Sequence, residues 1–237
     1  MNELPFFITI FINFIGVTLF YKLFKKAGVY TWIGIATIVA NIEATKCVDM
    51  FGLSLTLGNV VYSTVFLATD ILSEMYGGKE ARKGVGIGFL AMLVFTLVTQ
   101  VDILFVPNSQ DLVSESMKTI FSFMPRFCIA SMVTYAITNT LDTYLYDWIR
   151  KLLPADKFLW VRNNAATLIS QLVDSFLFTI LAFTGIYSFG FMVELSLTTF
   201  VMKFIVAILD TPFLYIAKKI SIKDEEAIQS LENKKEN

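Results

Sequence analysis

Long apolar runs extend along most of this chain and leave few choices for its fold. Each run covers about 20 residues, whereas an amphipathic helix of a soluble protein carries polar residues every few positions. Of the 237 residues, 56% are hydrophobic and 16% are charged, while soluble domains have roughly 25% charged residues. The sequence therefore predicts an all-α, polytopic membrane protein built as a helical bundle.

The apolar runs predict seven membrane-spanning helices. Their expected ranges are 4–24, 29–51, 55–76, 84–107, 125–149, 164–187 and 192–218. The link 108–124 has apolar residues at helical spacing, which favours a short interfacial helix or a lid. We expect a single transmembrane domain over residues 1–220. A polar cytoplasmic tail over residues 221–237, either a helix end or disordered, follows it.

The basic residues predict the orientation of these helices. If the N-terminus lies outside, 15 of the 19 Lys and Arg residues fall in the links 22–28, 77–83 and 150–163 or after residue 217. Cytoplasmic links carry an excess of Lys and Arg in membrane proteins. We therefore expect the N-terminus outside and the C-terminus in the cytoplasm.

Residue usage argues against several classes of function. The chain has no histidine, and its two cysteines, Cys47 and Cys128, lack CxxC spacing. Histidine is the commonest metal ligand and a frequent catalytic base, so we expect no catalytic residues, no metal and no cofactor. The net charge is −1 and no basic face is evident, so a nucleic acid is not an expected partner.

Polar residues inside the predicted spans are the main functional signal. A charged side chain at the bilayer centre costs on the order of 3 kcal/mol, so such residues are rare unless they have a role. Interhelical hydrogen bonds and side chains that reach the border explain some of them. A polar cavity between helices explains the whole set better. The candidate substrate-binding residues are Asn41, Glu43, Lys46, Asp70, Glu74, Arg126, Asn139, Gln171, Asp174 and Lys203.

The chemistry of these candidates narrows the class of ligand. Carboxylates accept hydrogen bonds from N–H groups, whereas Asn and Gln amides both donate and accept. Lys and Arg side chains balance the charge or donate to carbonyl groups. Such a site suits a planar heterocycle with amide-like edges, but other polar metabolites would also fit. The residues alone therefore predict a small polar ligand.

Five stretches of the sequence resemble one membrane protein family. They are ANIEATK (40–46), FLATDILSEMYGGKEARK (66–83), Arg126 followed by CIASMVTYAITNTLD (128–142), LWVRNNAATLISQLVDSFLF (159–178) and FVMKFIVAILDTPFLY (200–215). In order and spacing they are similar to the queuosine precursor transporters, also called vitamin-uptake-like transporters. The resemblance implies uptake of 7-cyano-7-deazaguanine, 7-aminomethyl-7-deazaguanine or queuine across a bacterial cytoplasmic (inner) membrane.

The resemblance also carries expectations about the site and the spans. A carboxylate can accept two hydrogen bonds from the ring N–H and the amino group of a guanine-like base, as acidic residues do when they read base edges. Many family members have six spans, so residues 29–218 are the expected core and the helix 4–24 is an addition. The family-like stretches contain the candidates Asn41, Lys46, Asp70, Glu74, Arg126, Gln171, Asp174 and Lys203.

Two other functions stay open from the sequence. The layout is also similar to substrate-binding subunits of energy-coupling-factor transporters, where an AxxxA contact such as Ala36 and Ala40 docks an energy-coupling module. Small residues four apart are nevertheless common in membrane helices. A lysine in the last span, Lys203, would suit a seven-helix retinal protein, although the three Trp lie near the inner borders. The expected partners are the base and the lipid bilayer, and a homodimer stays open.

Overall fold

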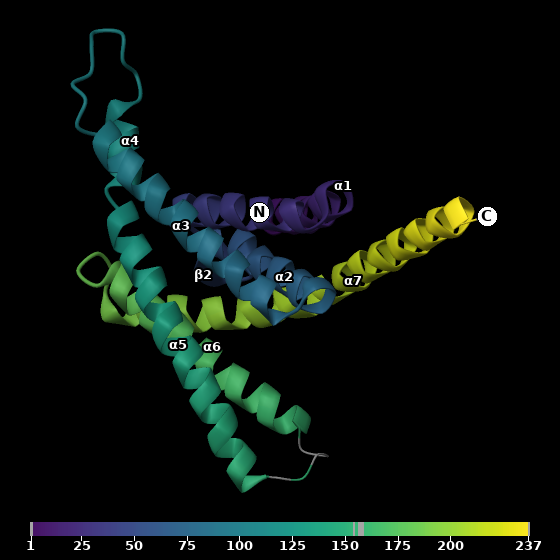
Figure 1. Cartoon of the computed structure of the whole chain (residues 1–237). Coiled ribbons are helices and arrows are strands. Elements are labelled where there is room, and N and C mark those ends of the chain that lie inside the picture. Colours follow the sequence, from purple (N-terminus) through teal and green to yellow (C-terminus); the bar gives the residue numbers. More distant parts are fainter. Residues whose placement is uncertain (1, 154, 156–158, 237) are drawn as a thin grey trace. The chain divides into compact units, whose positions relative to one another are not determined.

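A computed structural model describes residues 2–153, 155 and 159–236, and it is mostly helical (Figure 1). Its elements are α1 (Glu3–Glu43), β1 (Cys47–Met50), β2 (Leu53–Thr56), α2 (Gly58–Tyr76), α3 (Gly78–Asp102), α4 (Ser114–Phe121), α5 (Met124–Leu152), α6 (Leu159–Phe183) and α7 (Phe189–Glu236). The chain forms two compact units, each of which is described by itself. Unit 1 comprises Met1–Lys46, Leu57–Phe95 and Lys203–Asn237, and unit 2 comprises Cys47–Thr56 and Thr96–Met202.

Four helical segments among the described residues are long and apolar enough to cross a membrane. They are Glu3–Glu43, Gly78–Asp102, Ser114–Ile149 and Phe189–Ile222, and Thr167–Phe183 is a shorter apolar helix. Many large apolar side chains on them are exposed, including Leu4, Leu90 and Phe204. Large exposed apolar surfaces are unusual in soluble monomers and are expected where helices face lipid. The prediction of a helical membrane protein is confirmed at this level.

α1 consists of two helical segments that fold back on each other. At Lys25 the backbone leaves the helical region, with φ 53° and ψ −135°. Beyond this break the rings of Phe20 and Trp32 are 5.5 Å apart between centroids, and Gly16 lies directly against the indole of Trp32. In a straight helix residues 16 and 32 would be about 24 Å apart. The break falls in the predicted link 22–28, and each segment has a length that can span a bilayer.

Residues 47–56 form a β-hairpin in place of the predicted helix end. β1 and β2 pair antiparallel, and the turn between them has positive φ at Phe51 (53°) and Gly52 (77°). Two successive positive φ values suit a type I′ turn, which matches the twist of a hairpin. Asp49 and Ser54 are opposite each other, and Ser54 Oγ donates to Asp49 Oδ1 at 2.9 Å. These polar side chains therefore satisfy each other across the ladder.

The hairpin corrects the sequence-based prediction for this segment. The predicted helix 29–51 ends at Glu43, because the chain leaves the helical conformation before the first strand. Lys46 and Asp49 consequently lie outside the helix to which the sequence analysis assigned them. The fold is thus helical with one small two-stranded ribbon.

The link between α3 and α5 contains the short helix α4, as its apolar spacing predicts. Asp111 lies just before this helix, and its Oδ1 accepts hydrogen bonds from the backbone N–H groups of Ser114 (2.8 Å) and Val113 (2.9 Å). These bonds, with that from the Ser114 hydroxyl, lower the pKa of Asp111 below its ordinary value. The link is therefore an ordered connection with a capped helix.

Helix α7 continues through the predicted tail and ends at Glu236. Its 48 residues correspond to about 72 Å of helix, more than twice the hydrocarbon thickness of a bilayer. Residues 221–236 are thus the C-terminal continuation of α7.

Unit 1 is held together by close contacts at small residues. Gly58, at the start of α2, lies so near α1 that a Cβ atom there would be 2.2 Å from the Ala40 carbonyl oxygen. Ala36 and Ala40 of α1 are 1% and 4% exposed and pack against α2. Gly88 of α3 also approaches α1, near the hydroxyl of Thr37. Since Ala36 and Ala40 are buried within unit 1, they do not form an exposed docking face for an energy-coupling module.

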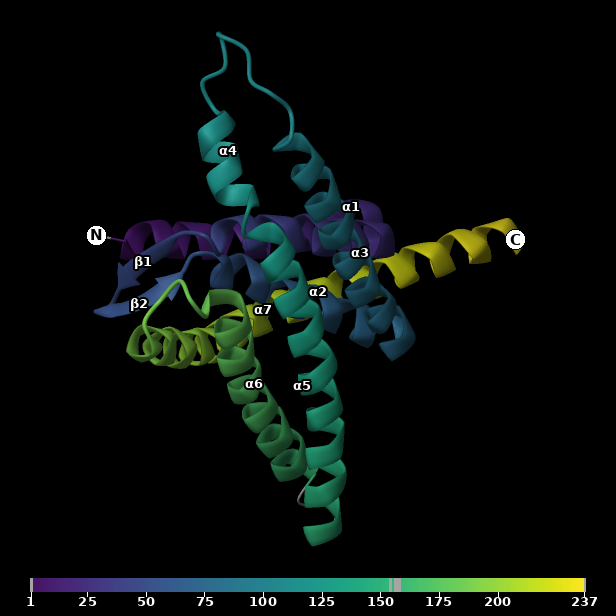
Figure 2. The same cartoon turned by 90° about the vertical axis from the view of Figure 1, so that its left-hand side faces the viewer.

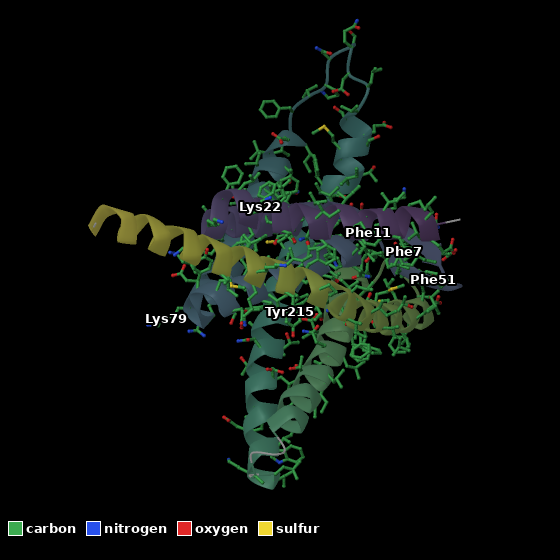
Figure 3. All side chains as sticks on the ribbon, turned by 90° about the vertical axis from the view of Figure 1, so that its right-hand side faces the viewer. Phe7, Phe11, Lys22, Phe51, Lys79 and Tyr215 are labelled. Atoms are coloured by element: carbon green, nitrogen blue, oxygen red, sulfur yellow. The ribbon has the colours of Figure 1, made fainter. Side chains whose placement is uncertain are left out.

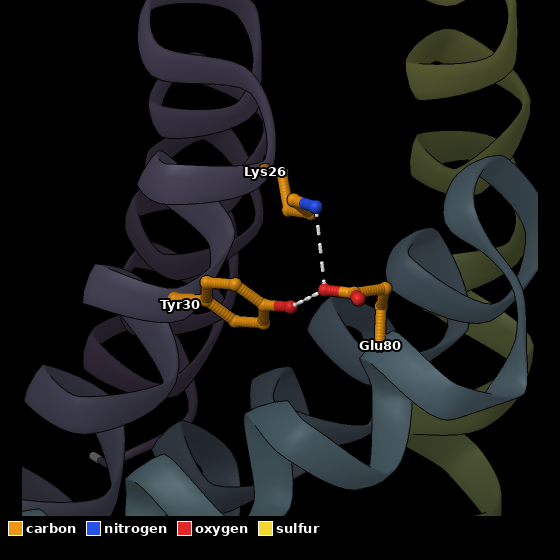
Figure 4. Close-up of polar contacts among 3 residues, drawn as sticks. All are labelled: Lys26, Tyr30 and Glu80. Atoms are coloured by element: carbon orange, nitrogen blue, oxygen red, sulfur yellow. Dashed lines mark hydrogen bonds and ion pairs between the residues drawn. The ribbon is translucent and has the colours of Figure 1, made fainter.

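One end of unit 1 gathers charged and polar side chains. Figure 3 shows Lys22 and Lys79 toward the end of the unit opposite Phe7. At that end Lys26 Nζ lies 3.3 Å from Glu80 Oε2, and the Tyr30 hydroxyl donates to the same oxygen (Figure 4). The interaction joins α1 to the first turn of α3.

Unit 2 is organised around the helix pair α5 and α6, which lie side by side (Figures 1 and 2). An aromatic cluster closes one end of the pair, where the Phe127 ring contacts the rings of Phe123, Phe178 and Phe183. Tyr187 packs against this cluster, and its hydroxyl lies 3.3 Å from Cys47 Sγ. The hairpin is thereby attached to the aromatic end of the pair.

A methyl group at Gly58 is expected to destabilise the protein. In Gly58→Ala the new Cβ would overlap the Ala40 carbonyl, and backbone atoms cannot move aside as a flexible side chain can. Overpacking of this kind costs about 1–3 kcal/mol, so the midpoint of thermal unfolding in detergent should fall by several degrees. Gly86→Ala is the matched control, because a Cβ there meets nothing within 4 Å. Equal midpoints for the two variants would contradict this contact.

Candidate functional site

A ladder of polar side chains connects α5 and α6 in unit 2. Ser170 Oγ donates to Asp142 Oδ1 at 2.7 Å. One turn along each helix, Thr138 Oγ1 lies 3.3 Å from Asp174 Oδ1 and also donates to the Thr134 carbonyl at 2.9 Å. Spacings of four residues place these groups on the facing sides of the two helices. The interface between these two helices therefore contains two successive polar contacts.

Two polar atoms beside this ladder are buried and lack a hydrogen-bond partner among the described residues. They are the Gln171 side-chain Oε1 and the Thr134 Oγ1. A buried group left without its hydrogen bond costs about 1–3 kcal/mol, so native proteins rarely keep one without a reason. Gln171 is three residues from Asp174, on the same side of α6. Together they offer an amide and a carboxylate to a ligand that presents N–H groups.

Arg126 has partners within the protein. Its Nε donates to the Leu181 carbonyl at 2.8 Å, and one terminal nitrogen donates to the Thr184 carbonyl at 2.5 Å. Both carbonyls belong to the C-terminal end of α6, where backbone acceptors lack helical partners. Arg126 thus holds the end of α6 against the start of α5, and its guanidinium is engaged without a substrate. Asn139, the other candidate on α5, is exposed.

The N-terminal candidates of unit 1 lie at the end of α1. Asn41 is 5% exposed, and its Nδ2 donates to the Thr37 carbonyl at 2.7 Å. Glu43 is partly buried, and its Oε2 has no hydrogen-bond partner among the described residues. Lys46 follows the helix and is exposed. The end of α1 therefore supplies one buried amide and one incompletely satisfied carboxylate.

The remaining candidates of unit 1 lie on α2 and α7. Glu74 Oε1 of α2 is 2.6 Å from Lys218 Nζ of α7, in an exposed ion pair. Asp70 lies one turn earlier on α2. Lys203 is partly buried on α7, two turns before Asp210. The ion pair of Glu74 and Lys218 therefore joins α2 to α7.

The ten predicted residues are divided between the two units. Asn41, Glu43, Lys46, Asp70, Glu74 and Lys203 belong to unit 1, and Arg126, Asn139, Gln171 and Asp174 belong to unit 2. Within unit 2, Gln171 and Asp174 lie three residues apart on the same side of α6. Within unit 1, the structure pairs Glu74 with Lys218, which the candidate set omits.

Sequence reasoning missed the threonines of the ladder. Thr134, Thr138 and Asp142 follow one another at intervals of four residues, which would have marked a polar face of α5. Threonine is common in membrane helices as a partner of its own backbone, so its presence alone carried little information. Among the described residues, no group of three or more His, Cys, Asp or Glu side chains could hold a metal ion.

Removal of the Arg126 guanidinium is expected to weaken the fold even without substrate. Arg126→Leu leaves the Leu181 and Thr184 carbonyls without their donor, and hydrogen bonds from a charged group contribute about 1.5–3 kcal/mol each. The thermal unfolding midpoint in detergent should therefore fall. Lys118→Leu, at an exposed position of α4, is the control and should leave the midpoint unchanged. A normal midpoint for Arg126→Leu combined with lost ligand binding would reassign Arg126 to the substrate.

Named relatives of this chain are membrane transporters. The chain is 46% identical, over 90% of its length and 93% of the relative's, to the "Probable queuosine precursor transporter" of Bacillus subtilis (strain 168). It is 27% identical, over 62% of its length and 59% of the relative's, to the protein of that name from Haemophilus influenzae. It is 25% identical, over 57% of its length and 58% of the relative's, to the "Queuosine precursor transporter" of Escherichia coli (strain K12). No solved structure matches the chain.

A family model covers most of the region in which the predicted resemblance lies. The family is described as "Putative vitamin uptake transporter", and the match extends over residues 56–217. The match includes four of the five stretches that carry the predicted resemblance, which is thereby confirmed. This chain belongs to that family of multi-pass membrane transporters and not to a family of enzymes.

Proposed function

We propose that this chain carries a queuosine precursor, a 7-deazaguanine base, into the cell across the cytoplasmic membrane of a bacterium. The observation that carries the proposal is the 46% identity, over 90% of this chain, to a transporter named for that substrate. The match covers nearly the full length of both proteins, so the transport machinery as a whole is shared. The names of the two more distant relatives agree with this substrate class.

Gln171 and Asp174 are the residues that we assign to the base. A 7-deazaguanine presents a ring N–H and an amino group side by side, and one carboxylate can accept from both. Asp174 supplies that carboxylate, and Gln171 Oε1 is a buried acceptor that lacks a hydrogen-bond partner among the described residues. A base bound here would satisfy an acceptor that otherwise costs free energy. Specificity would follow, because a ligand without these N–H groups leaves the acceptors unsatisfied.

The other predicted contacts support this assignment less directly. Glu74 and Arg126 are held by groups of the protein, and Asn139 and Lys46 are exposed. Asn41 and Glu43 lie at the end of α1, where the unsatisfied Glu43 Oε2 can accept a hydrogen bond from a solute. Asn41 and Glu43 remain substrate contacts in our proposal, secondary to Gln171 and Asp174.

The same proposal includes seven spans with the N-terminus outside. Four helical segments are long and apolar enough to cross a membrane, and the break at Lys25 divides one of them in two, which supports part of this count. In this proposal α2 and α6 are the remaining two spans. Within unit 1, Lys22 and Lys79 gather at one end (Figure 3), as the excess of basic residues in cytoplasmic links requires. The long C-terminal part of α7 would then extend into the cytoplasm.

Transport by the purified protein tests the proposed function. Liposomes that contain only this chain should take up labelled 7-cyano-7-deazaguanine faster than empty liposomes. Gln171→Leu and Asp174→Asn should each weaken binding of the base about ten- to a hundredfold, the effect of losing hydrogen bonds worth about 1.5–3 kcal/mol. Binding is measured by titration of the detergent-solubilised protein with the base.

The control for these variants is Leu172→Ala, a neighbouring apolar position on α6 that is 36% exposed. It should bind and transport the base as the unmodified protein does. Uptake that requires a second protein would favour a substrate-binding subunit of an energy-coupling system. Wild-type affinity in both Gln171→Leu and Asp174→Asn would refute the assigned binding residues.

A further inference from the structure

We propose that Asp142 of α5 is a second ligand-binding carboxylate, which binds a positively charged amino arm of the base. The inference rests on the proposed function and deepens it, because it adds a group that distinguishes one 7-deazaguanine from another. Asp174 would recognise the ring system that these bases share. Asp142 would then favour a base with an aminomethyl arm over a base with a neutral nitrile.

Asp142 lies one helical turn from the site assigned to the base. Ser170 Oγ donates to Asp142 Oδ1 at 2.7 Å, and Thr138 Oγ1 lies 3.3 Å from Asp174 Oδ1. On α5, Asp142 is four residues after Thr138. On α6, Ser170 is four residues before Asp174. The two contacts therefore follow each other at a rise of about 6 Å along the helices, and both carboxylates belong to the same helix interface.

A buried hydroxyl beside these contacts points to a ligand. Thr134 is one turn before Thr138 on α5 and is 2% exposed, and its Oγ1 has no hydrogen-bond partner among the described residues. On the facing helix, Gln171 Oε1 is buried without a partner in the same part of the chain. Native proteins seldom keep such groups unsatisfied. A polar ligand at the interface of α5 and α6 would account for both of them.

The polar contacts lie near the middle of both helices. α5 extends over Met124–Leu152 and α6 over Leu159–Phe183, so the contacts are within a few residues of the two midpoints. Asp142 is partly buried at this position. Solute sites of many transporters lie at the midplane of the bilayer, where a charged side chain is costly unless it has a role. The position of Asp142 therefore suits a group that binds a solute.

The hydroxyl contacts leave both carboxylate charges in place. Ser170 and Thr138 are neutral donors, and Thr138 also donates its single hydroxyl proton to the Thr134 carbonyl, at the shorter distance of 2.9 Å. A carboxylate has about four acceptor positions, so Asp142 and Asp174 can each accept further hydrogen bonds. An ammonium group would supply a donor and the opposite charge together. Its attraction to a carboxylate is stronger among apolar helices than in water.

An aminomethyl-bearing base matches the order of these groups. Its ring N–H and amino group would bind Asp174, as in the proposed site. Its arm ends in an amine that is protonated at neutral pH, and the arm extends beyond the ring system, toward a carboxylate one turn away. The nitrile of 7-cyano-7-deazaguanine is neutral and can only accept hydrogen bonds, so it gains nothing from Asp142.

The first test compares arms of similar size in the unmodified protein. 7-Aminomethyl-7-deazaguanine and 7-hydroxymethyl-7-deazaguanine differ mainly in charge, and each is titrated into the detergent-solubilised full chain beside the cyano base. The aminomethyl base should bind about ten- to a hundredfold more tightly than the other two, the effect of a hydrogen bond between charged groups. Equal affinities would overturn the inference and leave the proposed function standing. Binding of none of the bases would refute the proposed function itself.

The second test identifies the residue that reads the arm. Asp142→Asn keeps an oxygen that can accept from Ser170 but removes the charge. The variant should lose the preference for the aminomethyl base and keep its affinity for the cyano base. Asp147→Asn, at an exposed position of the same helix, makes the same change in charge and should keep the preference.

Two results with Asp142→Asn would overturn the role of Asp142. One is an unchanged preference for the aminomethyl base, and the other is an equal loss of affinity for both bases, which a merely structural role would produce. The comparison of arms in the unmodified protein remains decisive if the variant does not fold.

Discussion

The cost of charge among apolar helices is the constraint on which the rest of this structure depends. Several ionised groups have partners within the protein: Glu74 binds Lys218, Glu80 binds Lys26, and Arg126 binds the carbonyls at the end of α6. Each contact also fixes one helix against another, so the charged groups that need partners also orient the helices.

The helical character of the protein could be predicted from the sequence because it follows from composition averaged over long windows. The turn at Lys25 was predicted for the same reason, since three basic residues interrupt two apolar runs. The hairpin at residues 47–56 could not be predicted from the sequence. Its strands have four residues each, and a short apolar run does not distinguish a strand from a helix end. Its turn depends on local φ values at Phe51 and Gly52, which hydropathy does not encode.

The candidate residues were predictable as a set, but their partners were not. The insertion cost of a buried charge selects Asp70, Arg126 and Asp174 from sequence alone. The carbonyls that Arg126 binds lie 55 and 58 residues away, and backbone acceptors have no signature in the sequence. Likewise, the pairing of Glu74 with Lys218 depends on how α2 packs against α7. Residue type therefore predicts which groups need an explanation, and packing decides which explanation applies.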